Sequence, residues 1–201
     1  VSETDDAPTG TALIVVAQGE NAIIVVQGAN QHVGVANIQG VPFAKGDIVV
    51  AQFETPVDTT LAAFTAARSA GARTMLNPSP VTNIEQALLD QTDVLVVNEH
   101  EFEMIFGVPL GPVLTEEAGK PDSFAGVLVI TLGVNGVLAL SGGTRIRQPG
   151  RVVDVVDSTG AGDCFAGYLA AALHEEHHSK APDVGGDEHG LATAIGLANL
   201  A

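Results

Sequence analysis

The sequence is poor in basic residues. It contains 8 Lys and Arg against 24 Asp and Glu, which gives a formal net charge of −16. Nucleic acids and anionic membrane surfaces are bound by clusters of Lys and Arg, so we expect neither as a partner. A nucleotide is still compatible with this charge, because backbone N–H groups and metal ions can bind its phosphates without a basic patch.

Cysteine, aromatic residues and long apolar runs are scarce as well. Cys164 is the single cysteine, so the chain cannot form an internal disulfide, which fits a reducing cytoplasm. Aromatic residues make up 4% of the chain and hydrophobic residues 46%. The core is therefore built from Val, Ile, Leu and Ala, as is typical of a buried parallel sheet. No apolar run reaches the length of a membrane-spanning helix, and no signal-peptide pattern is found.

Two widespread nucleotide-binding motifs are missing. Gly119-Lys120 is followed by Pro121, so the chain has no P-loop. Phe165 stands where the third glycine of a dinucleotide-binding fingerprint would follow Gly160 and Gly162. A Rossmann oxidoreductase is therefore disfavoured, and a test of NAD binding would decide that alternative.

The order of predicted elements points to an α/β fold. Two strands at 11–18 and 22–27 flank a turn and predict a hairpin. From Asp47 onward strands and helices alternate, until a polar linker at 177–188 precedes a last helix near Gly190. The predicted strands are 47–52, 73–76, 93–97, 126–131 and 136–140, and the predicted helices are 57–70, 84–90, 99–106 and 161–174. This alternation predicts a mainly parallel sheet with helices on both faces, and ligands at the carboxyl ends of its strands.

The most informative segment is a glycine-rich turn between a strand and a helix. Gly160, Ala161 and Gly162 would leave their N–H groups unpaired at the helix start, where the helix dipole favours an anion. Asp163 follows in the first helical turn. A carboxylate beside a phosphate site suits phosphoryl transfer, where it can take a proton from an incoming hydroxyl. The plainer alternative is a tight turn followed by a carboxylate that the dipole stabilises.

The stretch 157–163, Asp-Ser-Thr-Gly-Ala-Gly-Asp, resembles the signature of the ribokinase family, also called the PfkB carbohydrate kinases. Further similar segments occur in the family's order along nearly the whole chain: 10–16, 19–23, 28–30, 52–54, 77–80, 98–101 and 131–136. The resemblance implies a ribokinase-like three-layer sandwich with a mainly parallel central sheet, incomplete in this chain. Residues 1–201 would form a single partial domain that holds the nucleotide-binding and catalytic part.

The resemblance also assigns catalytic and substrate roles. Asp163 matches the base that deprotonates the acceptor hydroxyl, and Gly160, Ala161 and Gly162 match the anion hole for the transferred phosphoryl group. Glu54 matches a carboxylate that contacts the sugar at a strand end. Its alternative is a solvated loop carboxylate.

Nucleotide and Mg²⁺ roles fall on two other segments. Asn98 and Glu101 match the family's Asn-x-x-Glu motif, which places Mg²⁺ and phosphate oxygens mostly through water. The alternative for this pair is a helix N-cap with a solvated carboxylate. Thr131, Gly133 and Gly136 match the nucleotide loop, for which the alternative is a plain β-turn.

The resemblance also implies a monovalent-cation site, of which this chain contains only two of the ligands. Asp157, through its side chain, and Thr159, through its carbonyl, match part of the K⁺ site that activates such kinases. The family's N-terminal part and extreme C-terminus have no counterpart here, so most of the sugar site, part of the adenine pocket and the lid would lie outside this chain. The parent protein is expected to be a homodimer.

The implied activity is ATP-dependent phosphorylation of a sugar hydroxyl. The resemblance favours D-ribose, giving ribose 5-phosphate. Fructose, a nucleoside or a ketodeoxy sugar acid remain open as acceptors, as does a non-catalytic relative that binds a nucleotide or a sugar.

Overall fold

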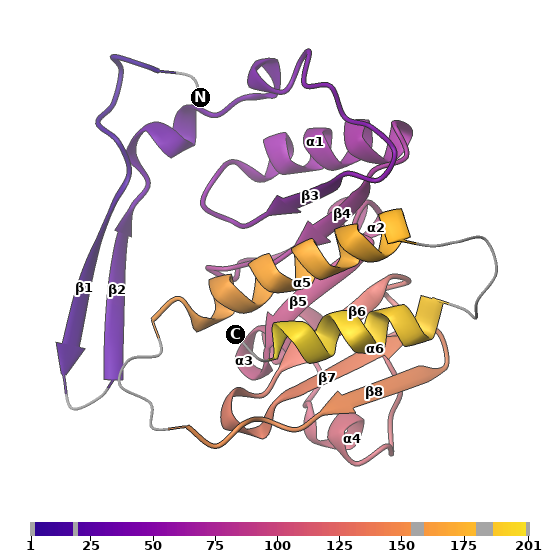
Figure 1. The fold of residues 1–201 in the computed structure, drawn as a ribbon. Coiled ribbons are helices and arrows are strands. Elements are labelled where there is room, and N and C mark those ends of the chain that lie inside the picture. The colour runs from indigo at the N-terminus through magenta and orange to yellow at the C-terminus, as the bar shows by residue number, and fades with distance from the viewer. Residues whose placement is uncertain (1–2, 18–19, 154–158, 180–186, 200–201) are drawn as a thin grey trace.

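The computed structural model describes residues 3–17, 20–153, 159–179 and 187–199. Its strands form two sheets, a two-stranded hairpin and a six-stranded sheet in the order β3-β4-β5-β6-β7-β8 (Figure 1). The strands are β1 (Thr11–Ala17), β2 (Glu20–Val26), β3 (Ile48–Ala51), β4 (Arg73–Leu76), β5 (Val94–Asn98), β6 (Val127–Thr131), β7 (Val137–Ser141) and β8 (Thr144–Gln148). The helices are α1 (Val57–Ser69), α2 (Gln86–Asp90), α3 (Glu99–Phe106), α4 (Gly111–Leu114), α5 (Ala161–Ser179) and α6 (Asp187–Ala198).

The central sheet is parallel from β3 to β6 and antiparallel from β6 to β8. Its middle strands are continuous apolar runs, Val-Leu-Val-Val in β5 and Val-Leu-Val-Ile in β6, because both of their faces are covered by helices. Leu95 pairs with Leu128, and Asn98 with Thr131 at the carboxyl ends of the two strands. The predicted alternating α/β order and mainly parallel sheet are confirmed.

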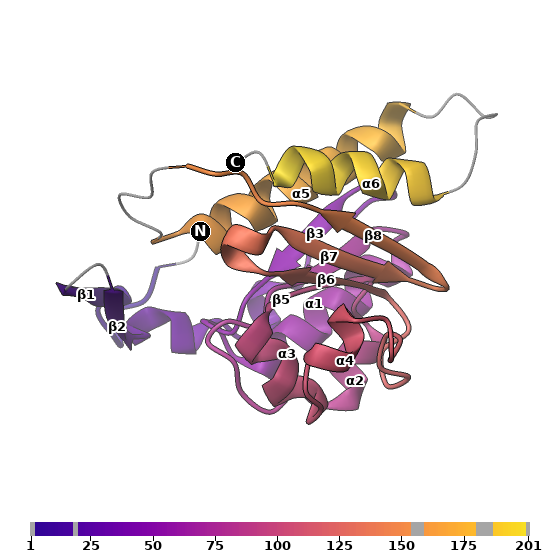
Figure 2. The same ribbon diagram turned by 90° about the horizontal axis from the view of Figure 1, so that it is seen from below.

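Helices cover the two faces of the sheet unequally. Figure 2 shows α1 to α4 on one side of the sheet and α5 with α6 on the other. The first face holds the larger core, where Phe64, Phe102 and Phe124 are almost completely buried. The second face packs Val129 against Leu169 of α5 and Ile195 of α6. These three layers position the ends of the strands at two opposite edges of the domain.

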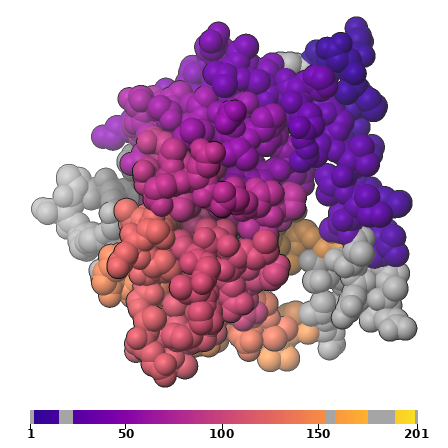
Figure 3. All heavy atoms as spheres, turned by 180° about the vertical axis from the view of Figure 1, so that it is seen from behind, coloured from indigo at the N-terminus to yellow at the C-terminus, as the bar shows by residue number. Residues whose placement is uncertain are grey.

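The β1–β2 hairpin stands apart from this sandwich. Figures 1 and 3 show it at one side of the molecule. Leu13 and Ile24 lie in it and are 61% and 58% exposed, so its apolar side chains are not part of the core. Within the described residues, no helix combines the length and apolarity needed to cross a membrane.

Several element boundaries differ from the sequence prediction. The helix predicted to end at residue 174 continues to Ser179, so the first residues of the expected polar linker are helical. The last helix begins at Asp187, earlier than expected. Strand β8 and helix α4 were not predicted at all.

Candidate active site

Three predicted site residues, together with Gln52, lie at the carboxyl edge of the parallel strands. Gln52 follows β3, Asn98 ends β5 and Thr131 ends β6. The amino end of α5 lies at the same edge, as shown by the hydrogen bond that Gln52 donates to Asp163, 111 residues further along the sequence. The fold therefore brings four distant segments of the chain to one edge of the sheet.

Asp163 lies in the first turn of α5 and is exposed. Its Oδ1 accepts a hydrogen bond of 2.8 Å from Nε2 of Gln52. Within the described part of the chain, no hydrogen bond involves its second carboxylate oxygen, Oδ2. Among the described residues, the carboxylate is thus held through one oxygen only, an arrangement compatible with proton transfer to the other oxygen.

Gly160, Ala161 and Gly162 lie where the turn before α5 passes into the helix, and we call them the glycine cradle. Gly160 has φ of +78°, a left-handed conformation that side chains rarely adopt, and the backbone N–H of Cys164 donates to its carbonyl at 2.9 Å. A Cβ atom at Gly160 or at Gly162 would meet no atom within 4 Å. Among the described residues, no atom fills the space beside these two glycines, which leaves room for a group bound at the helix start.

Asn98 and Glu101 form a reciprocal capping box at the start of α3. The Asn98 side chain accepts from the Glu101 N–H, and the Glu101 carboxylate accepts from the Asn98 N–H, both at 2.8 Å. Glu101 is 6% exposed, and this burial raises its pKa. The N-cap alternative is therefore right for Asn98, while the Glu101 carboxylate is buried and not solvated. The amide oxygen of Asn98 and the carboxylate oxygen of Glu101 are hard donors of the kind that Mg²⁺ prefers. Both already accept backbone hydrogen bonds, so they fit Mg²⁺ held through water molecules.

The nucleotide-loop residues differ in what they do structurally. The Thr131 hydroxyl lies 3.4 Å from the Val97 carbonyl, at the end of β6. Gly136 has φ of +89°, and a Cβ there would lie 2.0 Å from the Gln148 carbonyl, so close backbone packing requires this glycine. Gly133 has φ of +52°, and a Cβ there would meet nothing within 4 Å. Of the two glycines, only Gly133 faces open space that a nucleotide could use.

The remaining predicted residues lie outside this cluster of contacts or outside the described residues. Glu54 is exposed in the turn after β3, close in sequence to Gln52. Thr159 is exposed before α5, and Asp157 is not among the described residues. In the described ranges, no group of three or more His, Cys, Asp and Glu side chains could hold a metal ion. His174 lies 3.0 Å from the Gly46 carbonyl, a contact between α5 and the turn before β3.

Sequence analysis did not identify Gln52 as a site residue. Its position at the carboxyl end of a predicted strand was the available signal. That Gln52 contacts Asp163 could be recognised only once the strand order was known.

Solved structures share this fold. The ribokinase of Thermotoga maritima superposes with a TM-score of 0.71 and 29% identity, over 96% of this chain and 63% of that chain. An Arabidopsis thaliana ribokinase in complex with ribose and ATP has a TM-score of 0.73 and 28% identity, over 97% of this chain and 63% of that one. Fold and site together define an α/β protein of the ribokinase-like class, with a glycine turn beside a carboxylate.

The chain belongs to the pfkB family of carbohydrate kinases, whose model matches residues 1–201. A ribokinase of Staphylococcus aureus (strain COL) is 30% identical over 98% of this chain and 70% of its own length. A ribokinase of Mus musculus is 33% identical over 85% of this chain and 56% of its own length. The chain thus spans between about half and 70% of the length of these relatives.

Proposed function

We propose that this chain is the catalytic and nucleotide-binding part of an ATP-dependent sugar kinase, a single partial domain over residues 1–201. The observation that carries the proposal is the Asp163 carboxylate, fixed by Gln52 on one side and open beside the glycine cradle on the other. Membership of the pfkB family supports the same reaction class.

In this proposal ATP supplies the phosphoryl group and the sugar supplies the acceptor hydroxyl. Asp163 accepts the hydroxyl proton as the oxygen attacks phosphorus, a contribution worth roughly 10²–10⁴-fold for a general base. The N–H groups around Gly160, Ala161 and Gly162 stabilise the negative charge that spreads over the phosphoryl oxygens. Gln52 keeps the carboxylate in place, so that its free oxygen faces the acceptor.

The proposed cofactor contacts follow the family motif. Asn98 and Glu101 would hold Mg²⁺ through water, with the nucleotide along Thr131, Gly133 and Gly136. Glu54 is the proposed sugar contact. The proposed K⁺ site uses Asp157 and Thr159, with the parent protein acting in the cytoplasm as a homodimer on a sugar and ATP.

The acceptor we propose is D-ribose, giving ribose 5-phosphate. The names of several relatives, among them the ribokinases of Staphylococcus aureus and Mus musculus, support this choice. A structural neighbour that shares the fold at 22% identity is a fructokinase from Vibrio cholerae O395 with fructose, ADP and calcium bound. A different sugar would keep the mechanism and change only the acceptor.

The test is ADP release by the intact protein with Mg²⁺ and K⁺, over ribose, fructose, adenosine and a ketodeoxy acid. Turnover with ribose that falls at least about 100-fold in Asp163→Asn supports the proposal. Asp122→Asn is the matched control, because Asp122 is an exposed carboxylate in a loop away from the cradle. Tight ATP binding without turnover on any acceptor would instead identify a non-catalytic binding protein.

A further inference from the structure

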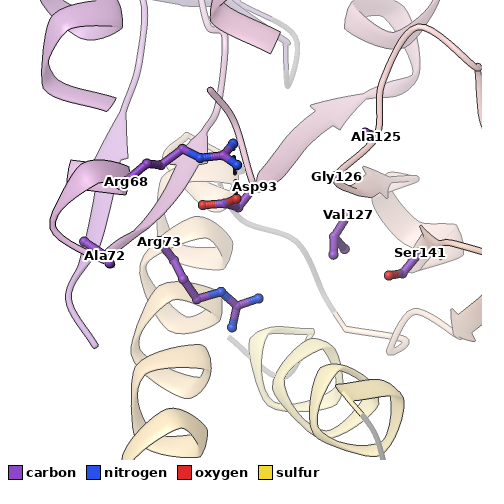
Figure 4. A pocket seen from close by; sticks show the side chains of 9 residues that line it. Arg68, Ala72, Arg73, Asp93, Ala125, Gly126, Val127 and Ser141 are labelled. Carbon is purple, nitrogen blue, oxygen red and sulfur yellow. Dashed lines mark ion pairs between the residues drawn. The ribbon is translucent and has the colours of Figure 1, made fainter. Parts of the chain in front are cut away.

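A pocket lies at the amino ends of the parallel strands, opposite the edge that holds Asp163. Its volume is about 420 Å³. The ends of β4, β6 and β7 and the C-terminal turn of α1 surround it, together with Asp93, which precedes β5 (Figure 4). A ligand here would not overlap with one at the Asp163 edge, because the two sites lie at opposite ends of the same strands.

One side of this pocket carries a fixed ion pair. Nη1 of Arg68 lies 3.4 Å from Oδ1 of Asp93 and donates to the Asp90 carbonyl at 2.9 Å. Oδ2 of Asp93 also accepts from the backbone N–H of Thr74 at 2.9 Å. The Asp93 carboxylate is therefore paired with Arg68 and hydrogen-bonded to Thr74, and among the described residues it forms no ion pair with the further cation at this pocket.

That further cation is Arg73, the first residue of β4. It lies two residues before buried Met75 on the same strand, so both side chains lie on the sheet face that α5 and α6 cover. Ser141 ends β7 on the same face, and Figure 4 shows its hydroxyl and the Arg73 guanidinium pointing into the pocket from opposite sides. Among the described residues, neither side chain has a hydrogen-bond or ion-pair partner.

Among the described residues, the ion pairs formed by arginine involve Arg68 and Arg145, and Arg73 forms none. Arg73 directs its charge into a hollow that also holds the Arg68 guanidinium and the Ser141 hydroxyl. Guanidinium groups bind phosphate through two parallel N–H···O bonds, and a hydroxyl can donate a third.

We infer that this pocket binds the phosphate group of a small molecule, through Arg73 and Ser141, with Arg68 beside them. The recognised chemistry is the phosphate dianion, supplied by inorganic phosphate or by a phosphate monoester. The inference does not depend on the proposed kinase activity, since it uses none of the residues at the catalytic edge.

Calorimetric titration of the intact protein tests the inference. Inorganic phosphate and, separately, ribose 5-phosphate are titrated at constant ionic strength, with saturating ADP and Mg²⁺ present to occupy the catalytic edge. We expect Arg73→Gln to raise the phosphate Kd at least about tenfold, as loss of a charge-assisted bond implies. Arg147→Gln removes the same charge from an exposed position on β8 and should leave the Kd unchanged.

Ser141→Ala is the second variant, which keeps the test valid if Arg73→Gln does not fold. It should raise the Kd about threefold to tenfold, because a hydrogen bond to a charged partner is lost. Equal affinity for both ligands would show that the site recognises the phosphate group alone. Tighter binding of ribose 5-phosphate would show that it recognises a phosphate monoester. No binding with ADP present, or equal weakening by Arg147→Gln and Arg73→Gln, would overturn the inference.

Discussion

Replacing Gln52 by Leu should weaken catalysis without preventing ATP binding. The change removes the amide that donates to Oδ1 of Asp163 at 2.8 Å and keeps a side chain of similar size. A hydrogen bond to a charged acceptor is worth about 1.5–3 kcal/mol. Because Asp163 is exposed and water can replace part of this contact, we expect the lower end of that range. About 1.5 kcal/mol corresponds to a roughly tenfold fall in kcat.

The pH dependence of kcat separates this role from a purely structural one. The amide stabilises the ionised carboxylate, so its loss makes ionisation of the base harder. The acidic limb of the kcat–pH profile should therefore move to higher pH in Gln52→Leu. Gln52→Glu should move it further, since two neighbouring carboxylates would share one proton at neutral pH. KM for ATP should change little in either variant.

The assay is ADP release at saturating ATP and sugar, measured across pH. Gln86→Leu is the matched control, because Nε2 of Gln86 also donates to a carboxylate oxygen, Oδ1 of Asp90, at 2.8 Å. Gln86 lies on α2, which precedes β5 and is remote from the carboxyl edge. An unchanged kcat and pH profile in Gln52→Leu, or the same loss in Gln86→Leu, would refute the positioning role.

Three further predictions concern the same edge. Glu101→Gln should raise the free energy of unfolding at neutral pH, because burial disfavours the charged carboxylate and each pKa unit corresponds to about 1.4 kcal/mol. Its folded pKa is raised, so wild type should gain stability relative to this variant as pH falls through that pKa, as urea unfolding at several pH values would reveal. An advantage of the variant that does not shrink on acidification would contradict this assignment. Asn98→Ala should cost about 1 kcal/mol of stability through the lost N-cap, measured by the same unfolding assay, with weaker Mg²⁺-dependent turnover. Gly136→Ala should destabilise the protein by more than about 2 kcal/mol, because its Cβ would lie 2.0 Å from a carbonyl oxygen. The control Gly142→Ala has φ of +56° and no described atom within 4 Å of its Cβ, so it should cost only about 1 kcal/mol. Equal losses of stability in thermal unfolding would show that close packing at residue 136 is not limiting.

Much of the fold could be predicted because its signals are local. The apolar runs of β5 and β6 and the polar residues that end them identify central parallel strands within a few residues. Helix α3 was predicted at its observed bounds, since Asn98 and Gly107 mark its two ends by N-cap and left-handed C-cap chemistry. Strand β8, Thr-Arg-Ile-Arg-Gln, escaped because it has a single apolar residue and lies at the sheet edge, where burial imposes little pattern.

What the sequence alone determined is the family signature, the order of elements and the expectation that Asp163 lies beside a glycine turn at a helix start. These depend on neighbours in the chain, whose spacing the backbone geometry constrains directly. Only the tertiary structure decided that Gln52 holds Asp163 and that Glu101 is buried. It also decided that Arg73 and Ser141 face one pocket at the far end of the sheet. Each of these depends on which strands lie side by side and which helix covers which face, and residue spacing along the chain does not specify such long-range arrangements.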